Sequence, residues 1–197
     1  MRHGFLSLWA LVLTVVNICA AGRVEAETRP IDAEHSTLTV LAYKSGLFSA
    51  FADDHLISAP IASGSIAEEA PLGIELAIRS ADLRVLDPNL APGRRAEVQA
   101  RMLGSEVLDV TRFSDITFAS TAIEPAGGDR WKVAGRLTIR GQARVVTFSV
   151  VRLKGRYRGD VLIKQRDFGI EPISIAGGTV KVKDELKIQF EIVAAEK

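Results

Sequence analysis

Apolar and polar side chains alternate through residues 131–140, which read WKVAGRLTIR. The odd positions include Trp131, Val133, Leu137 and Ile139, whereas the even positions are mostly lysine, arginine and threonine. Successive side chains of a β-strand point to opposite faces, so this period of two predicts a strand with one buried face and one solvated face.

The same alternation recurs on both sides of this strand. Residues 74–78 and 186–192 repeat it in full, and residues 180–183 repeat it in a shorter form. Further strands are predicted at residues 37–43, 48–57, 64–68, 116–121, 145–154 and 159–166. Glycine, proline, aspartate and serine separate the runs, and so many short strands with regular turns favour an antiparallel barrel or sandwich.

One segment has a helical period instead. Residues 94–108 place Val98 and Met102 on one face, and Glu97 and Arg101 form an i, i+4 pair of opposite charge. We therefore expect a helix of about three turns over this range. The complete expectation is an all-β chain of eight to ten short strands with one or two helices.

The chain begins like a secretory precursor. Arg2 precedes an apolar stretch at residues 5–21, and Val24-Glu25-Ala26 places small residues where a signal peptidase cleaves. We expect a signal peptide at residues 1–26, cleaved after Ala26, and one domain at residues 27–197. The mature protein is then expected to be periplasmic or secreted, with no stable membrane insertion after cleavage.

Composition narrows the chemistry. The 197 residues carry a net charge of +1 and no basic cluster, so nothing marks a nucleic-acid surface. The single cysteine, Cys19, lies in the predicted signal peptide, and only His35 and His55 remain after cleavage. The mature domain then has no disulfide and no thiol nucleophile. We expect no catalytic residue, no metal site and no nucleic-acid partner.

The predicted buried face consists of valine, isoleucine, leucine and phenylalanine. Closing the sheet into a barrel would bury this face and remove exposed strand edges. A barrel of about eight strands is either filled by its side chains or holds one small ligand, and the pattern alone leaves both readings open. A cavity lined in this way would bind hydrocarbon. At roughly 0.3 kcal/mol per heavy atom, a chain of about forty carbons gains on the order of 12 kcal/mol.

Four segments resemble, in order, the YceI-like family of lipid- or polyisoprenoid-binding proteins. Residues 32–36, DAEHS, are similar to its opening D-x-x-H-S, and residues 108–121 are similar to a block that ends in F-x-S-T. Residues 135–141, GRLTIRG, match its G-x-L-T-I-x-G strand and turn. Residues 166–170, RDFGI, resemble its R-x-x-F-G-I segment. The resemblance covers roughly residues 31–193.

This resemblance implies an extended, lipocalin-like antiparallel β-barrel with an isoprenoid chain in its interior. The expected ligand is a polyisoprenoid or an isoprenoid quinone, bound for sequestration or transport, with no other cofactor. Strand parity and the resemblance together nominate a lining of Phe48, Phe51, Val133, Leu137, Ile139, Phe148, Phe168 and Phe190. His55 or Arg166 would then contact a polar head group at an opening.

Other interpretations stay open on sequence grounds. The barrel could be filled by its own side chains, as in a ligand-free structural or stress protein. The groups Asp32-Ala33-Glu34-His35 and Asp53-Asp54-His55 could together hold the metal of a hydrolase. Arg166 could pair with a carboxylate, and Phe48 and Phe51 could be ordinary core residues. A homodimer is a further candidate assembly.

Overall fold

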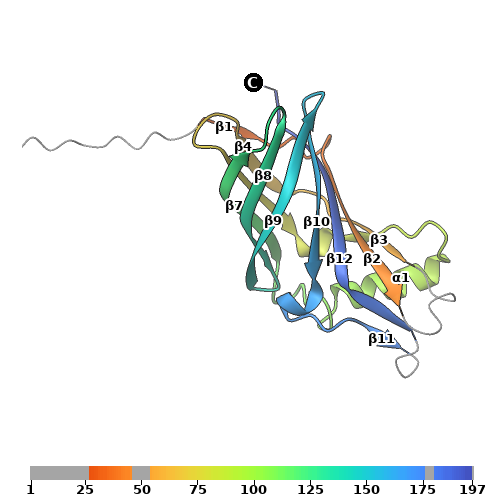
Figure 1. The fold of residues 1–197 in the computed structure, drawn as a ribbon. Coiled ribbons are helices and arrows are strands. Elements are labelled where there is room, and N and C mark those ends of the chain that lie inside the picture. Colours follow the sequence, from red (N-terminus) through yellow and green to blue (C-terminus); the bar gives the residue numbers. More distant parts are fainter. Residues whose placement is uncertain (1–26, 46–53, 176–179, 197) are drawn as a thin grey trace, which may run out of the picture.

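The computed structural model describes residues 27–45, 54–175 and 180–196 and is an all-β fold with one α-helix in the described ranges (Figure 1). The first six strands are β1 (Thr28–Pro30), β2 (Thr37–Ser45), β3 (His55–Ser58), β4 (Ser63–Ala67), β5 (Gly73–Arg79) and β6 (Arg84–Val85). The others are β7 (Asp115–Pro125), β8 (Arg130–Ile139), β9 (Gln142–Leu153), β10 (Arg156–Lys164), β11 (Ser174–Ile175) and β12 (Val180–Val193). The helices are α1 (Pro92–Leu103) and two short 3-10 turns, η2 (Ser80–Asp82) and η3 (Gln165–Phe168).

The strands form a ring in which three long strands are each divided into two segments. β1 and β2 follow one another along the chain, as do β3 and β4, and β5 and β6. Antiparallel pairing runs in the order β1-β4-β5-β7-β8-β9-β10-β12-β2-β3-β6. Both ends of this order, β1 and β6, therefore lie against the divided strand made of β3 and β4. Counted as continuous strands, eight strands enclose the interior.

The predicted antiparallel barrel is confirmed, but its sheet consists of twelve segments rather than about eight. Pro60 lies between β3 and β4, and proline has no N–H to donate to a ladder. Asp32 interrupts the first strand because its Oδ1 accepts the backbone N–H groups of Glu34 and His35, both at 3.1 Å. η2 separates β5 from β6, and β11 adds a short pairing to β12. These local turns were not visible in the alternation.

The helix begins and ends earlier than predicted. Pro92 occupies its first turn, where a missing N–H costs nothing. It ends at Leu103 because the Gly104 N–H donates to the Ala100 and Arg101 carbonyls at 3.0 and 3.1 Å while Gly104 itself is extended. The prediction of helix through Leu108 was therefore wrong: the residues after Gly104 form turns that lead to β7.

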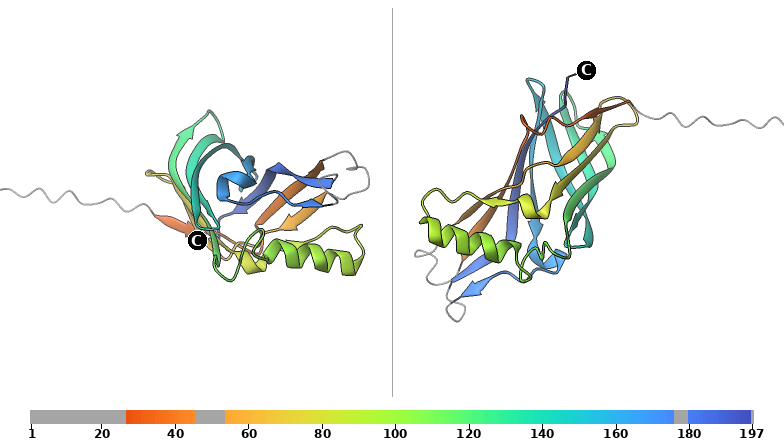
Figure 2. Two further views of the ribbon diagram at one scale, coloured as in Figure 1. Left: turned by 90° about the horizontal axis from the view of Figure 1, so that it is seen from below. Right: turned by 180° about the vertical axis from the view of Figure 1, so that it is seen from behind.

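The barrel has two different ends (Figure 2). β1 and the described C-terminal residues lie at one end, and α1 and β11 lie at the other. Ile31, Ile66 and Ile192 form a small buried cluster beside β1, whereas a larger cluster that includes Phe118 and Phe168 lines the rest of the interior. No helix in the described part of the chain is long and apolar enough to cross a membrane. The predicted signal peptide, Phe48 and Phe51 lie outside the described residues.

Candidate ligand cavity

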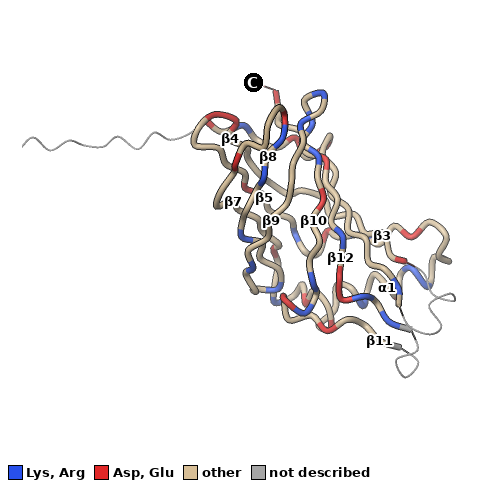
Figure 3. Tube along the Cα trace, viewed as in Figure 1, with Lys and Arg blue, Asp and Glu red and all other residues tan. Residues whose placement is uncertain are grey.

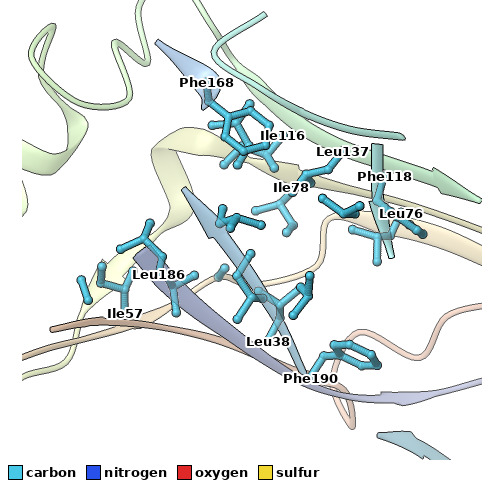
Figure 4. A pocket seen from close by; sticks show the side chains of 18 of the residues that line it. Leu38, Ile57, Leu76, Ile78, Ile116, Phe118, Leu137, Phe168, Leu186 and Phe190 are labelled. Atoms are coloured by element: carbon cyan, nitrogen blue, oxygen red, sulfur yellow. The ribbon is translucent and has the colours of Figure 1, made fainter. Parts of the chain in front are cut away.

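The barrel encloses a cavity of about 840 Å³. This volume lies in the upper part of the range typical of small-molecule sites, about 300–1,000 Å³. Figure 4 shows how side chains from several strands face it, among them Leu38, Leu76, Leu186 and Phe190. Most of its lining is aliphatic or aromatic. Among the residues that the structure describes, the side chains leave this space open, which favours a hollow barrel over one filled by its own side chains.

Three phenylalanines on alternate strands line the cavity and contact one another. Phe118 of β7 and Phe148 of β9 have ring centroids 5.6 Å apart, and Phe148 and Phe190 of β12 have centroids 5.4 Å apart. The strands between them carry glycine: a Cβ on Gly135 would overlap the Phe118 ring, and a Cβ on Gly159 would lie 2.6 Å from Phe190 Cζ. The Phe118 and Phe190 rings therefore lie over these glycines, in space that larger side chains there would occupy.

One end of the cavity, here called the Tyr157 end, is built from polar groups that pair with one another. The Tyr157 hydroxyl donates to Glu68 Oε1, and Arg29 Nη1 donates to Glu68 Oε2 at 2.5 Å. Arg29 also donates to the Ala195 carbonyl, which ties β1 to the end of β12. The Trp131 and Tyr157 rings contact each other at a centroid distance of 6.0 Å. This end of the cavity is therefore lined by polar groups that bond to one another.

Burial and hydrogen bonding shift two pKa values at the Tyr157 end. The hydrogen bond from Tyr157 lowers the pKa of Glu68, and Arg29 lowers it further, against the opposing effect of burial. Burial raises the pKa of Tyr157, and its hydrogen bond to the Glu68 carboxylate raises it further. Both shifts favour the same arrangement, a neutral phenol donating to a carboxylate.

The opposite end, here called the helix end, carries polar side chains of a different kind. Lys44, Arg94, Arg101 and Lys181 line it together with one acidic residue, Glu97 (Figure 3 shows the Lys and Arg positions on α1). Arg94 Nη1 lies 3.3 Å from Glu97 Oε2, and both side chains are largely exposed. Exposed pairs of this kind contribute little to stability. The helix end is therefore basic, and the exposed ion pairs of Arg94 and Arg101 contribute little to holding the fold.

A histidine–aspartate pair adjoins the helix end. His55 lines the cavity two residues before Ile57, on the same face of β3. Its Nδ1 lies 2.6 Å from Oδ2 of Asp87, whose side chain is only 3% exposed. Asp87 Oδ1 accepts the backbone N–H of Leu56 at 2.7 Å. The carboxylate is thus fixed on both oxygens, and it fixes the imidazole in turn.

The structure brings most of the predicted lining residues together around one cavity. Those that line it are His55, Val133, Leu137, Ile139, Phe148, Phe168 and Phe190. Arg166 is exposed and lies outside the lining, where its Nη2 donates to Glu171 at 2.5 Å and its Nη1 lies 3.7 Å from Asp184. Phe48 and Phe51 fall outside the described residues, so their role stays a prediction.

The structure separates the two groups suggested for a metal. His35 Nδ1 lies 2.8 Å from Asp32 in the break between β1 and β2, beside β12. His55 lies in β3, near the opposite end of the barrel, and pairs with Asp87. Within the described ranges, no three His, Cys, Asp or Glu side chains come together as a metal site would require.

No sequence pattern predicted the pairs of polar residues at the two ends of the cavity. Tyr157 and Glu68 are 89 residues apart, and His55 and Asp87 are 32 residues apart. Strand parity does place Tyr157 on the inner face with Val161, because they are separated by an even number of residues. An aspartate before a proline, as in Asp87-Pro88, is ordinary turn composition, so no pattern marked it.

Comparisons with known proteins agree with this architecture. Residues 30–194 match the family model of the YceI-like domain. A UPF0312 protein of Vibrio cholerae serotype O1 is 23% identical over 132 residues, which cover 62% of this chain and 66% of that protein. The crystal structure of Burkholderia cenocepacia BcnA has a TM-score of 0.64 and 22% identity, and the match covers 84% of this chain and 99% of BcnA. BcnA therefore shares the barrel fold.

Proposed function

Because the chain belongs to the YceI-like family, we propose that it is an exported binding protein whose barrel holds one long apolar molecule, a polyisoprenoid or an isoprenoid quinone. The observation that carries the proposal is the apolar cavity of about 840 Å³ inside the barrel. The protein would sequester or transport this molecule, and we assign no bond-making chemistry to it.

The lining supports an elongated hydrocarbon ligand. Isoleucine, leucine, valine and phenylalanine side chains from β2, β5, β8 and β12 all face the same space. Transfer of apolar surface out of water supplies roughly 25 cal/mol per Å². Each isoprene unit that enters the cavity adds to this gain, so affinity is expected to rise with chain length until the cavity is full.

The two ends of the cavity support one orientation of the ligand. At the Tyr157 end, Glu68 is already held by Tyr157 and Arg29. At the helix end, Arg94 and Arg101 are exposed and His55 lines the cavity. We therefore place the apolar tail toward Tyr157 and the polar head group at the helix end. Export follows from the predicted signal peptide at residues 1–26, which places the ligand in the periplasm or outside the cell.

The test uses two adjacent residues of β10 that face opposite sides of the wall. Val161 lines the cavity, whereas Leu162 is 55% exposed on the outside. Val161→Trp fills the cavity, and Leu162→Trp places the same side chain in solvent. Purified protein is freed of lipid and loaded with the fluorescent apolar probe N-phenyl-1-naphthylamine, which is then displaced by farnesol, geranylgeraniol and longer isoprenoid alcohols.

We expect displacement to become tighter with each added isoprene unit in the native protein and in Leu162→Trp. Val161→Trp should lose at least tenfold in affinity for the longest alcohol, because its tail no longer fits. Affinity independent of chain length, or equal binding by the two variants, would refute the proposal. Native mass spectrometry of the loaded protein gives the stoichiometry, expected to be one ligand per chain.

A further inference from the structure

The His55–Asp87 pair presents one ring nitrogen to the cavity. Nδ1 of His55 faces Oδ2 of Asp87 at 2.6 Å, and the residue itself lines the cavity at the helix end. Among the described residues, Nε2 has no hydrogen-bond partner, although the imidazole is largely buried, with 22% of the side chain exposed. A carboxylate can only accept hydrogen bonds, so in the neutral imidazole Nδ1 carries the proton and Nε2 presents a lone pair.

The surroundings of Asp87 fix the position of its carboxylate and therefore favour this tautomer of His55. Its Oδ1 accepts the Leu56 N–H at 2.7 Å, and its side chain is 3% exposed. Leu56 follows His55 directly in β3, so the backbone that carries the imidazole also positions the carboxylate. Asp87 does not line the cavity. It is therefore a positioning residue, which acts on a ligand only through His55.

We propose that Asp87 and His55 select ligands whose head group carries a hydroxyl, such as an isoprenoid alcohol, phenol or quinol, over ligands whose head group can only accept hydrogen bonds. This inference rests on the proposed function and specifies the head group of the same site. A hydroxyl donates to Nε2 and can also accept from the cationic side chains that line the helix end. A methyl ether or a quinone carbonyl offers Nε2 no proton. For a quinone, the selection would therefore favour the reduced form.

The sharpest test is a substitution that moves the proton of His55 from one ring nitrogen to the other and leaves the rest of the site in place. In Asp87→Asn the side-chain oxygen is still required by the Leu56 N–H, so the amide NH₂ faces His55 Nδ1. Nδ1 must then accept, and the proton moves to Nε2. The same histidine, at the same position, becomes a donor toward the cavity. The preference between donor and acceptor head groups should reverse with it.

The probes are geranylgeraniol and its methyl ether, measured by displacement of N-phenyl-1-naphthylamine at pH 8. We expect the native protein to bind the alcohol about fivefold more tightly, the worth of one net hydrogen bond. Asp87→Asn should bind the ether at least as tightly as the alcohol. His55→Phe should bind both equally. Asp109→Asn changes another buried aspartate, one that does not line the cavity, and should keep the native preference.

Nitrogen-15 NMR of labelled histidine gives a readout that a purely structural role would not move. The chain has three histidines, of which His3 lies in the predicted signal peptide, so His35→Gln in the mature protein leaves His55 as the source of the histidine signals. The protonated ring nitrogen is expected to be Nδ1 in the native protein and Nε2 in Asp87→Asn. Equal binding of alcohol and ether by the native protein, or an Nε2 proton in its spectrum, overturns the inference and leaves the proposed function intact. If neither probe displaces the dye, both fail.

Discussion

The two ends of the barrel use polar residues in opposite ways. At the Tyr157 end, the phenol, the Glu68 carboxylate and the Arg29 guanidinium are joined to each other and to the Ala195 carbonyl. At the helix end, Arg94 and Arg101 are exposed, and His55 lines the cavity with Nε2 unpaired among the described residues. Polar groups that satisfy one another hold a fold together, whereas polar groups with spare hydrogen-bonding capacity are available to a ligand. The contrast separates the end that holds the fold from the end at which we propose that a head group binds.

Apolar packing follows the same division. Ile192 of β12 is 1% exposed and belongs to the small cluster with Ile31 and Ile66 beside the Tyr157 end. Ile188, four residues earlier on the same strand, also lines the cavity but is only partly buried. A partly buried side chain has fewer neighbours to lose, so the same truncation should cost less there.

The largest expected effect is on stability near the Tyr157 end. Ile192→Ala should lower the free energy of unfolding by about 3–4 kcal/mol, because it opens a void in a packed cluster. Ile188→Ala, which only enlarges an existing cavity, should lower it by about 1–2 kcal/mol. Urea unfolding of both variants measures the difference. Equal losses would mean that the two ends are packed alike.

A second prediction concerns the wall between the ends. Gly135→Ala places a Cβ into the Phe118 ring, which must swing into the cavity. We expect a loss of about 1–3 kcal/mol in the free energy of unfolding and weaker binding of the longest isoprenoid alcohols. Gly73→Ala is the matched control on β5, since its Cβ would meet only the Ala67 Cβ at 3.8 Å. If Gly135→Ala keeps full affinity for long chains, the rings do not define the width of the cavity.

The third prediction uses the lowered pKa of Glu68. A carboxyl whose pKa is lower in the folded protein stabilises it above the unfolded value, 4.5 for this residue, and loses this contribution as pH falls through the folded value. The native protein should therefore be more stable than Glu68→Gln by about 1 kcal/mol at pH 7. The difference should shrink as the pH falls below 4.5 and through the lower pKa of the folded protein. Thermal unfolding between pH 3 and 7 tests this, and a difference that does not change with pH would contradict it.

The smallest effect is expected from a charge at the helix end. Arg101 is about half exposed, and its Nε lies 3.4 Å from Glu106 Oε2. Arg101→Gln should change the free energy of unfolding by less than about 0.5 kcal/mol, as for other exposed ion pairs. Arg29→Gln at the Tyr157 end removes a half-buried charge and several hydrogen bonds, so it should cost about 1–2 kcal/mol. A costly Arg101→Gln would show that the helix end also holds the fold.

The sequence predicted what depends on neighbours along one strand. Alternation placed Val133, Leu137 and Ile139 on the inner face of β8, and all three line the cavity. It did not predict which polar residues meet, because Glu68 and Tyr157 come together only when β4 and β10 lie on the same ring. The end of α1 was missed for a local reason: the apolar spacing continued past Gly104 into turns that also face the interior.

Arg166 shows a different limit. The sequence left two roles open for it, a contact with the head group or a pair with a carboxylate, and the structure shows the second: the guanidinium turns outward to Glu171 and Asp184. Phe168, two residues later, is 1% exposed and lines the cavity. The 3-10 turn η3 rotates neighbouring side chains away from one another, and a motif without a known backbone conformation cannot show which of them faces inward.

Because Phe118 and Phe190 each lie against a glycine, single substitutions at these positions can change the width of the cavity. A larger residue at position 135 or 159 would push one ring into the lumen and shorten the longest tail that fits, while a smaller residue at 118 or 190 would widen the passage. A smaller residue at 118 or 190 leaves the strand ladders in place, whereas a Cβ at 135 or 159 would also lie 2.7 Å from the Ala119 carbonyl oxygen or 2.5 Å from that of Ser149. Proteins descended from one ancestral barrel could therefore evolve to bind lipids of different width while keeping the same fold.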